Sequence, residues 1–260
     1  MRLPQKKILG LIGFGLGMYL LFLIALFPAA LGWQWLPPAL KQQVNLQGIS
    51  GSIWSGRVAI ATVNGYESGP LRWQLSPFSL LLGHLGIDAQ IKIPAGRIQG
   101  RFTIISDTEF EAEDVSGELL ADAISALSIR QLPVPVMLRG KMKPEIKSLR
   151  FHKGQTLQIQ GEVKWLNASV EGVQSFPLGV VELKAEPKKQ GSRITIRNNG
   201  GALELSGNLQ LNGNGSYQLN LGLLNRDNQR QDLKTMLSML GTPDATGRVH
   251  FRYKGKLPIR

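Results

Sequence analysis

Long stretches of this chain alternate apolar and polar side chains, and this alternation limits the possible folds more than any other feature of the sequence. Within 157–165, every second residue from Leu157 to Trp165 is apolar or glycine, and the residues between them are Gln, Glu or Lys. The pattern recurs at 181–186, 203–211, 217–223 and 248–254. A period of two is typical of antiparallel strands that have one dry face and one solvated face. The sequence therefore predicts a mainly β fold.

Turn residues separate the alternating segments. Asn-Gly pairs supply the positive φ angles that a tight hairpin turn needs. The candidate turns are Asn64–Gly65, Pro94–Gly96, Lys153–Gly154, Gln190–Gly191, Asn199–Gly200 and Asn212–Gly213. Consecutive hairpins predict an antiparallel meander, since parallel βαβ units would need long crossover connections.

Few segments have the features of helices. Ser76 can cap a short helix that has Pro77 at its first position. Residues 118–127 are a second candidate, and residues 228–240 are the best one, because their leucines share a face and Gly241 follows. So few helices cannot cover the apolar face of the sheet. The sheet must close into a sandwich or barrel, or curl into an open groove whose dry side meets something else. These arrangements all stay open.

One strand register can be argued from charge. A turn around Ser106 would place Thr103 opposite Glu109 and Arg101 opposite Glu111. Each such cross-strand pair contributes about 0.2–1 kcal/mol. We therefore interpret the acidic run between residues 107 and 122 as a solvated strand face paired with Arg101, in preference to a calcium or paired-carboxylate site.

The N-terminal part differs from the rest because residues 8–33 carry no charged side chain. A bilayer core needs about 20 apolar residues as helix, so we predict a transmembrane helix over 8–32. Arg2, Lys6 and Lys7 precede it, which by the positive-inside rule leaves residues 1–7 in the cytoplasm. Residues 33–44 are then a linker, and 45–260 form a translocated β-rich domain. The alternative is a signal peptide cleaved near Ala30–Gly32, but the apolar run is too long for one.

Gly13 and Gly17 in this segment fit the small-xxx-small pattern. The pattern predicts a helix-packing face, through which the chain would form a homo-oligomer. The alternative is that glycine is simply frequent in transmembrane helices, and both interpretations stay open.

Composition excludes several function classes. The chain has no cysteine and three histidines, which rules out thiolate metal sites and disulfides. Motifs of phosphate binding, zinc hydrolysis or serine nucleophiles are missing, so we expect no enzyme, no metal and no cofactor. The net charge is +12, of which +9 follows the predicted anchor. Beyond a membrane this charge would meet anionic lipid or acidic proteins, not nucleic acid. Alternatively, it decorates edge strands and prevents their pairing.

Three segments, in their order along the chain, resemble type II secretion system protein N, the N component of the general secretion pathway. They are Gly48–Gly56 (GISGSIWSG), Gly69–Leu75 (GPLRWQL) and Leu240–Gly247 (LGTPDATG), with the first following directly after a single apolar segment. The resemblance covers nearly the whole chain. It implies a single-pass protein of the Gram-negative inner membrane with its C-terminal domain in the periplasm.

The resemblance also implies a function and partners. The family is an accessory, non-enzymatic component of the machine that exports folded periplasmic proteins across the outer membrane. We therefore expect protein–protein contacts between the periplasmic β domain and other secretion components of the inner membrane and periplasm. The alternative is a groove that contacts or transfers membrane lipid, as in AsmA-like and TamB-like proteins. We expect Trp54, Trp73, Pro243, Asp244 and Gly247 to be structural anchors.

Overall fold

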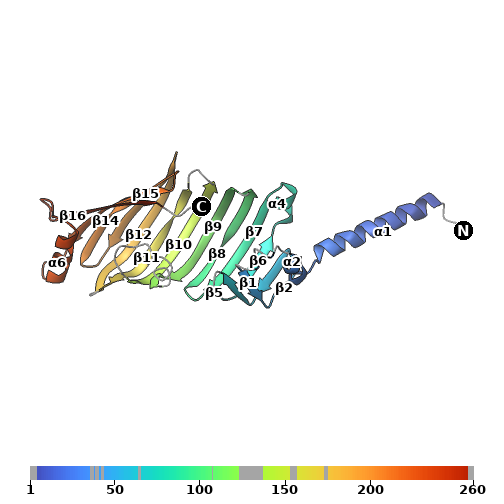
Figure 1. Cartoon of the computed structure of the whole chain (residues 1–260), viewed down its shortest axis with the longest axis horizontal. Coiled ribbons are helices and arrows are strands. Elements are labelled where there is room, and N and C mark those ends of the chain that lie inside the picture. The colour runs from blue at the N-terminus through green and yellow to red at the C-terminus, as the bar shows by residue number, and fades with distance from the viewer. Residues whose placement is uncertain are drawn as a thin grey trace.

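The computed structural model describes residues 5–35, 38, 41, 44–63, 66–106, 108–122, 137–152, 157–172 and 175–256. Most of them belong to one antiparallel sheet of 13 strands, and three further strands form a small second sheet. From β6 to β16, strands adjacent in the sheet are also consecutive in the sequence. Figure 1 shows the sheet as a long twisted layer with α2 near one end and α6 at the other. The predicted mainly β antiparallel meander is confirmed, and the sheet is open.

The element bounds are as follows. The large sheet contains β2 (Ser50–Gly51), β3 (Ser55–Val58), β6 (Leu71–Leu75), β7 (Leu85–Ile93), β8 (Gly96–Ser106), β9 (Glu109–Leu120), β10 (Met137–His152), β11 (Gln158–Glu171), β12 (Ser175–Lys188), β13 (Gly191–Asn199), β14 (Leu203–Asn212), β15 (Ser216–Asn225) and β16 (Val249–Lys256). The small sheet contains β1 (Val44–Gln47), β4 (Ile60–Val63) and β5 (Tyr66–Ser68). The helices whose bounds the structure describes are α1 (Gln5–Ala25), α2 (Ala29–Trp35), α4 (Pro77–Leu81) and α6 (Gln231–Leu240).

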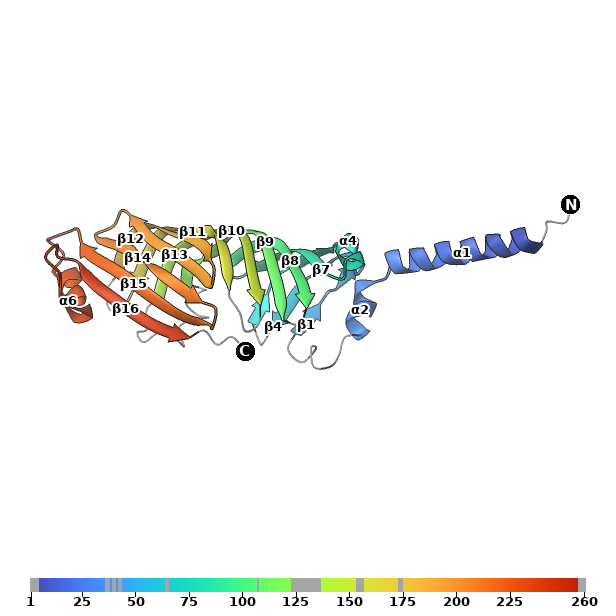
Figure 2. The same ribbon diagram turned by 90° about the horizontal axis from the view of Figure 1, so that it is seen from above.

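The N-terminal segment forms two helices where the sequence predicted one continuous span over 8–32. The break falls at Pro28, which pairs with Ser52 in an isolated β-bridge. Proline lacks the amide hydrogen that a helix interior requires, which explains why α1 ends before it. On the N-terminal side of the break, α1 projects away from the sheet (Figure 2). Within the described residues, no helix combines the length and the apolar character needed to cross a membrane. The predicted transmembrane helix is not confirmed and stays a prediction.

The buried hydrophobic cluster of the large sheet lies at α6, although single residues elsewhere, such as Val58 of β3 and Ala112 of β9, are also buried. Leu233 and Leu237 of α6 are almost completely buried and form one cluster with Trp165, Val181 and Val249. Away from this cluster, the inward side chains of neighbouring strands, such as Ile146 in β10, are only half-buried. Of the three arrangements left open by the sequence, the structure therefore shows the open one, with the core concentrated at the C-terminal end.

Register shifts bend the middle of the sheet. Irregularities interrupt the pairing of β8 with β9, of β10 with β11 and of β11 with β12. Asn167 lies at one of them with φ of 49°, a left-handed conformation that asparagine tolerates better than most residues. Such bulges increase the local right-handed twist of a sheet. These bulges account for the curl of the open sheet.

The predicted register of β8 and β9 is wrong by two residues. Arg101 lies opposite Glu113, and Thr103 lies opposite Glu111. The cause is the position of the turn, because Ser106 is itself the strand partner of Glu109 and the chain therefore reverses after Ser106, not around it. The polar face is unchanged, because a displacement of two residues preserves the side of each side chain. The ion-pair partner of Arg101 is Asp88 of β7, with Nε and Oδ1 3.1 Å apart.

Two of the three predicted helices are present. Ser76 caps α4 by accepting a hydrogen bond from the Ser79 amide, as its sequence predicts. The helix predicted over 228–240 is α6, which begins three residues later at Gln231 and ends before Gly241. The helix predicted over 118–127 is wrong for its first three residues, which continue β9 and pair with β8 and β10. Ala121 and Asp122 are helical, as predicted, and residues 123–127 lie outside the described residues.

We expect Leu233→Ala to lower the free energy of unfolding by about 2–5 kcal/mol, because it would leave a cavity in the buried cluster. Met239→Ala on the same helix is the matched control, since Met239 is 80% exposed. Urea unfolding of the purified full chain in detergent, followed by circular dichroism, measures both. Equal midpoints for the two variants would contradict a core centred on α6.

Candidate interaction surface

The two edges of the large sheet differ greatly in length. One edge is β2, which has only two residues, and the other is β16, which has eight. β16 pairs with β15 over its whole length without a register shift. Its side chains alternate strictly, with His250, Arg252, Lys254 and Lys256 exposed and Phe251, Tyr253 and Gly255 half-buried. The long edge therefore presents basic side chains on the polar face and apolar ones on the other.

The basic side chains of β16 face uncharged neighbours on β15. Opposite Arg252, Lys254 and Lys256 lie Asn220, Gln218 and Ser216. Among the described residues, no carboxylate lies within ion-pair distance of these three cations. Inner strands differ, because Arg150 pairs with Glu111 at 2.9 Å and Lys141 with Glu118 at 2.9 Å. The edge therefore carries basic side chains without an acidic partner in the described part of the chain, whereas these two basic side chains of the inner strands each have one.

A turn at 243–248 fixes the beginning of β16. Asp244 Oδ1 accepts hydrogen bonds from the Thr246 hydroxyl at 2.6 Å and from the amides of Thr246 and Arg248 at 2.8 and 3.1 Å. Its Oδ2 lies 2.8 Å from His250 Nε2. The hydrogen bond from the Thr246 hydroxyl is the main cause that holds the pKa of Asp244 far below its usual range, and the contact with His250 is the second. Gly247 adopts φ of +79°, which side-chain-bearing residues rarely accept.

Arg248 then attaches β16 across the neighbouring strand. Its side chain passes over Gly222 of β15, and its guanidinium reaches Glu204 at 2.7 Å and the Ser206 hydroxyl at 2.8 Å, both on β14. Glu204 also pairs with Arg226 at 3.3 Å. The hydrogen bond from Arg248 is the main cause that lowers the pKa of Glu204. The N-terminal end of β16 is therefore held by side chains as well as by backbone pairing.

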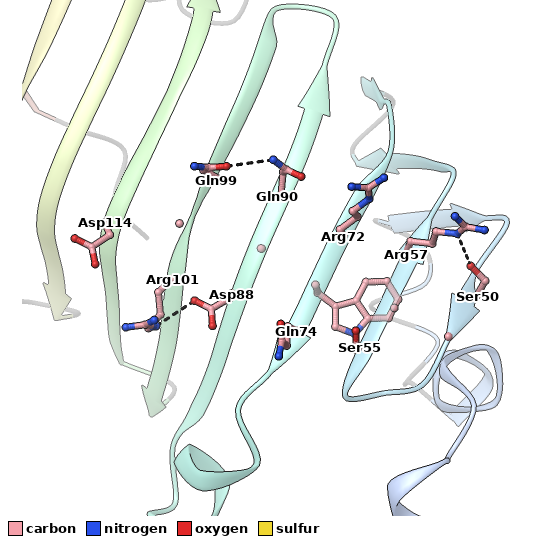
Figure 3. A pocket seen from close by; sticks show the side chains of 15 residues that line it. Ser50, Ser55, Arg57, Arg72, Gln74, Asp88, Gln90, Gln99, Arg101 and Asp114 are labelled. Carbon is pink, nitrogen blue, oxygen red and sulfur yellow. Dashed lines mark hydrogen bonds and ion pairs between the residues drawn. The ribbon is translucent and has the colours of Figure 1, made fainter.

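An open groove of about 820 Å³ crosses the polar face near the β2 end (Figure 3). Arg57 and Arg72 lie on its floor as direct cross-strand partners, an unfavourable arrangement of like charges. Arg57 Nε donates to Ser50 Oγ at 3.1 Å. On the neighbouring strands Gln90 and Gln99 are joined by a hydrogen bond of 3.2 Å. The lining of the groove combines Arg57, Arg72 and Arg101 with the carboxylates of Asp88 and Asp114 and the ring of Trp73.

The structure places Trp54 and Trp73 at the junction between α1 and the sheet. The Trp54 indole donates to the Ile24 carbonyl at 2.8 Å, and the Trp73 indole donates to the Ile53 carbonyl at 3.0 Å. Both side chains are half-buried. Trp54 therefore attaches α1 to the sheet, and Trp73 fixes the connection between β2 and β3, while the buried cluster lies at the other end.

The remaining predicted residues lie apart from these surfaces. Gly13 and Gly17 are on α1, where an added methyl group would have no neighbour within 4 Å. Their packing role stays a prediction. Pro243, Asp244 and Gly247 all belong to the turn before β16, where Pro243 bridges to Val249. In the described part of the chain, His, Asp and Glu side chains do not gather in a group of three that could hold a metal ion.

Fold and edge together define an open meander protein with one long, basic strand edge. A family model described as type II secretion system (T2SS), protein N matches residues 42–252. Since the match covers most of the chain, this protein belongs to that family, as the sequence resemblance predicted. No solved structure matches the chain significantly.

Three relatives share the family name and most of their length with this chain. Type II secretion system protein N of Vibrio cholerae serotype O1 is 29% identical over 232 residues, covering 85% of this chain and 88% of the relative. The proteins of the same name from Aeromonas hydrophila and Klebsiella pneumoniae are 27% and 25% identical. Each of these two matches covers 92% of this chain, and they cover 94% and 92% of the relatives.

We expect Asp244→Asn to lower the melting temperature most at neutral pH. Because folding depresses the pKa of this carboxyl, its stabilising effect is complete above the unfolded value and is lost as pH falls below about 4. The difference in melting temperature between the two proteins should therefore shrink on acidification. Thermal unfolding between pH 3 and 7 measures it, with the exposed Glu67→Gln on β5 as control. A difference independent of pH would contradict this origin.

We expect Gly56→Ala to destabilise the junction by about 1–3 kcal/mol through overpacking. An added Cβ would lie 2.3 Å from the Trp73 ring, so the indole would have to leave its position and its bond to Ile53. Gly172→Ala is the control, because its added methyl group meets nothing within 4 Å. Urea unfolding compares the two variants, and the same midpoint for both would disprove close packing at Gly56.

Proposed function

We propose that this protein is an accessory, non-enzymatic subunit of the type II secretion system. It would take part in the export of folded proteins from the periplasm through protein–protein contacts of its β region. The observation on which the proposal rests is the family match, which spans the sheet from β1 into β16. Membership of a secretion machine implies contact with its other components.

The open sheet supports contact as the mode of action. A closed sheet satisfies its own backbone groups, whereas β16 leaves the outer backbone groups of a long strand available. The family assignment does not depend on this edge, but it agrees with a role as a binding partner. The polar groove near Arg57 and Arg72 offers a second exposed surface on the same sheet.

We further propose that residues 8–32 hold the protein in the inner membrane, with residues 1–7 in the cytoplasm and 45–260 in the periplasm. The uncharged run and the basic residues before it support this topology. The apolar side chains of α1 that the structure describes are exposed, among them Leu11 at 76% and Phe14 at 70%. Water is an unfavourable solvent for such a surface. The lipid-contacting alternative stays a prediction, and we do not propose it, because the family match favours the secretion machine.

We expect deletion of the gene to reduce the export of secreted enzymes and the intact gene to restore it. The measurement is enzyme activity in the medium relative to the periplasm, with a cytoplasmic marker to exclude lysis. Cross-linking in whole cells should recover other secretion components with the tagged chain. Unchanged export together with no such cross-links would disprove the proposal.

A further inference from the structure

Within the part of the chain that the structure describes, one side of β16 is unoccupied along most of its length. The turn before the strand covers only its beginning, where the Asp244 amide donates to the Arg248 carbonyl at 2.9 Å and Pro243 bridges to Val249. From His250 to Lys256, no described strand pairs with the outer side of β16. An edge of this kind presents a row of free backbone donors and acceptors that can pair with another strand.

The inner strands show which charges this polar face combines. Glu182 of β12 has a basic residue on each side, Lys164 on β11 and Arg197 on β13. In the same way Glu186 lies opposite Arg193, and Lys184 lies opposite Glu162. From β11 to β13, acidic and basic side chains therefore occupy matching positions, although β10 and β11 also place Lys143 opposite Lys164 and Glu145 opposite Glu162. At β16 the basic set is present, but among the described residues its acidic counterpart is missing on both sides.

We propose that β16 accepts a strand from another protein in which acidic and apolar side chains alternate. The acidic ones would lie beside Arg252, Lys254 and Lys256, and the apolar ones would continue the other face beside Phe251 and Tyr253. This inference rests on the proposed function, since it specifies the chemistry of one contact within the secretion machine. Backbone pairing supplies affinity in such strand addition, and the alternating side chains supply selectivity.

A second copy of this chain fits the edge poorly. Two β16 strands side by side would place basic residues against basic residues, which is unfavourable in a sheet. The other edge, β2, has two residues, and the sequence contains no acidic residue before Glu67. Basic residues on an edge also discourage unwanted pairing. At β16 this effect is selective. The basic side chains repel a basic strand and would lose water against an apolar one, but they attract an acidic strand.

The experiment uses the full chain in detergent and a fluorescent peptide in which Glu and Val alternate over the length of β16. Fluorescence anisotropy should show binding of this peptide and not of a scrambled peptide with the same composition. The variant R252E/K254E/K256E should bind it about tenfold less tightly, and should gain binding of a peptide in which Lys and Val alternate. The variant K92E/K147E/K188E has the same net charge but reversed charges on inner strands, and should bind the acidic peptide like the wild type.

N-methylation of the peptide separates strand addition from attraction between charges. Methyl groups on the amides of alternate residues block pairing on one side of the peptide only. Two peptides are compared, one methylated on the odd-numbered amides and the other on the even-numbered ones. One of them should lose binding and the other should keep it. Equal binding of both, or equal effects of the two charge variants, would overturn the proposal.

Two further outcomes would also overturn it. The first is that the edge variant loses binding to anionic vesicles while the acidic peptide never binds, which would assign the edge to lipid. The second is a dimer in sedimentation that the edge variant abolishes, which would assign it to a second copy. Failure of the proposed function is distinguishable, because normal export in the deletion strain would leave the peptide result unchanged.

Discussion

Consistent pairing register between neighbouring strands is the constraint on which the rest of the structure depends. From β6 to β16, each strand places its apolar side chains on the same side as its neighbours do. A slip by one residue at any pair would move a whole row of side chains to the opposite face. The buried cluster, the charge pairs of the polar face and the basic edge all exist because this register is kept across the sheet.

The two ends of the sheet are stabilised differently. At the C-terminal end, α6 buries Leu233 and Leu237 against the strands, and Arg248 and Asp244 hold the last strand in position. At the N-terminal end, the contacts are indole hydrogen bonds and the close approach of Trp73 to Gly56. Between them the apolar face is half-covered, and much of its stability comes from cross-strand pairs and backbone hydrogen bonds. The buried C-terminal end therefore serves as a rigid base for the exposed edge of β16.

Local features of the sequence predicted the hairpin order and two helices well. Turn residues such as Pro94–Gly96, and the cap formed by Ser76, act within a few residues of where they stand. The predictions were wrong where distant contacts or local irregularities determine the secondary structure or the strand register. The turn fell after Ser106 and changed a register, Pro28 divided a helix, and pairing with β8 kept Glu118 in a strand. The basic alternation of 248–254 was visible, but only the complete strand order shows that β16 is an edge.

Because spatial order follows sequence order in this sheet, almost all contacts join strands that are neighbours in the chain. Such an arrangement can grow one hairpin at a time, and the strands already formed present the next edge to the chain that follows. Inserting or removing a hairpin would alter the length of the sheet by two strands and leave its topology intact. The distance spanned by the protein is therefore a quantity that evolution can adjust in steps, independently of how the chain folds.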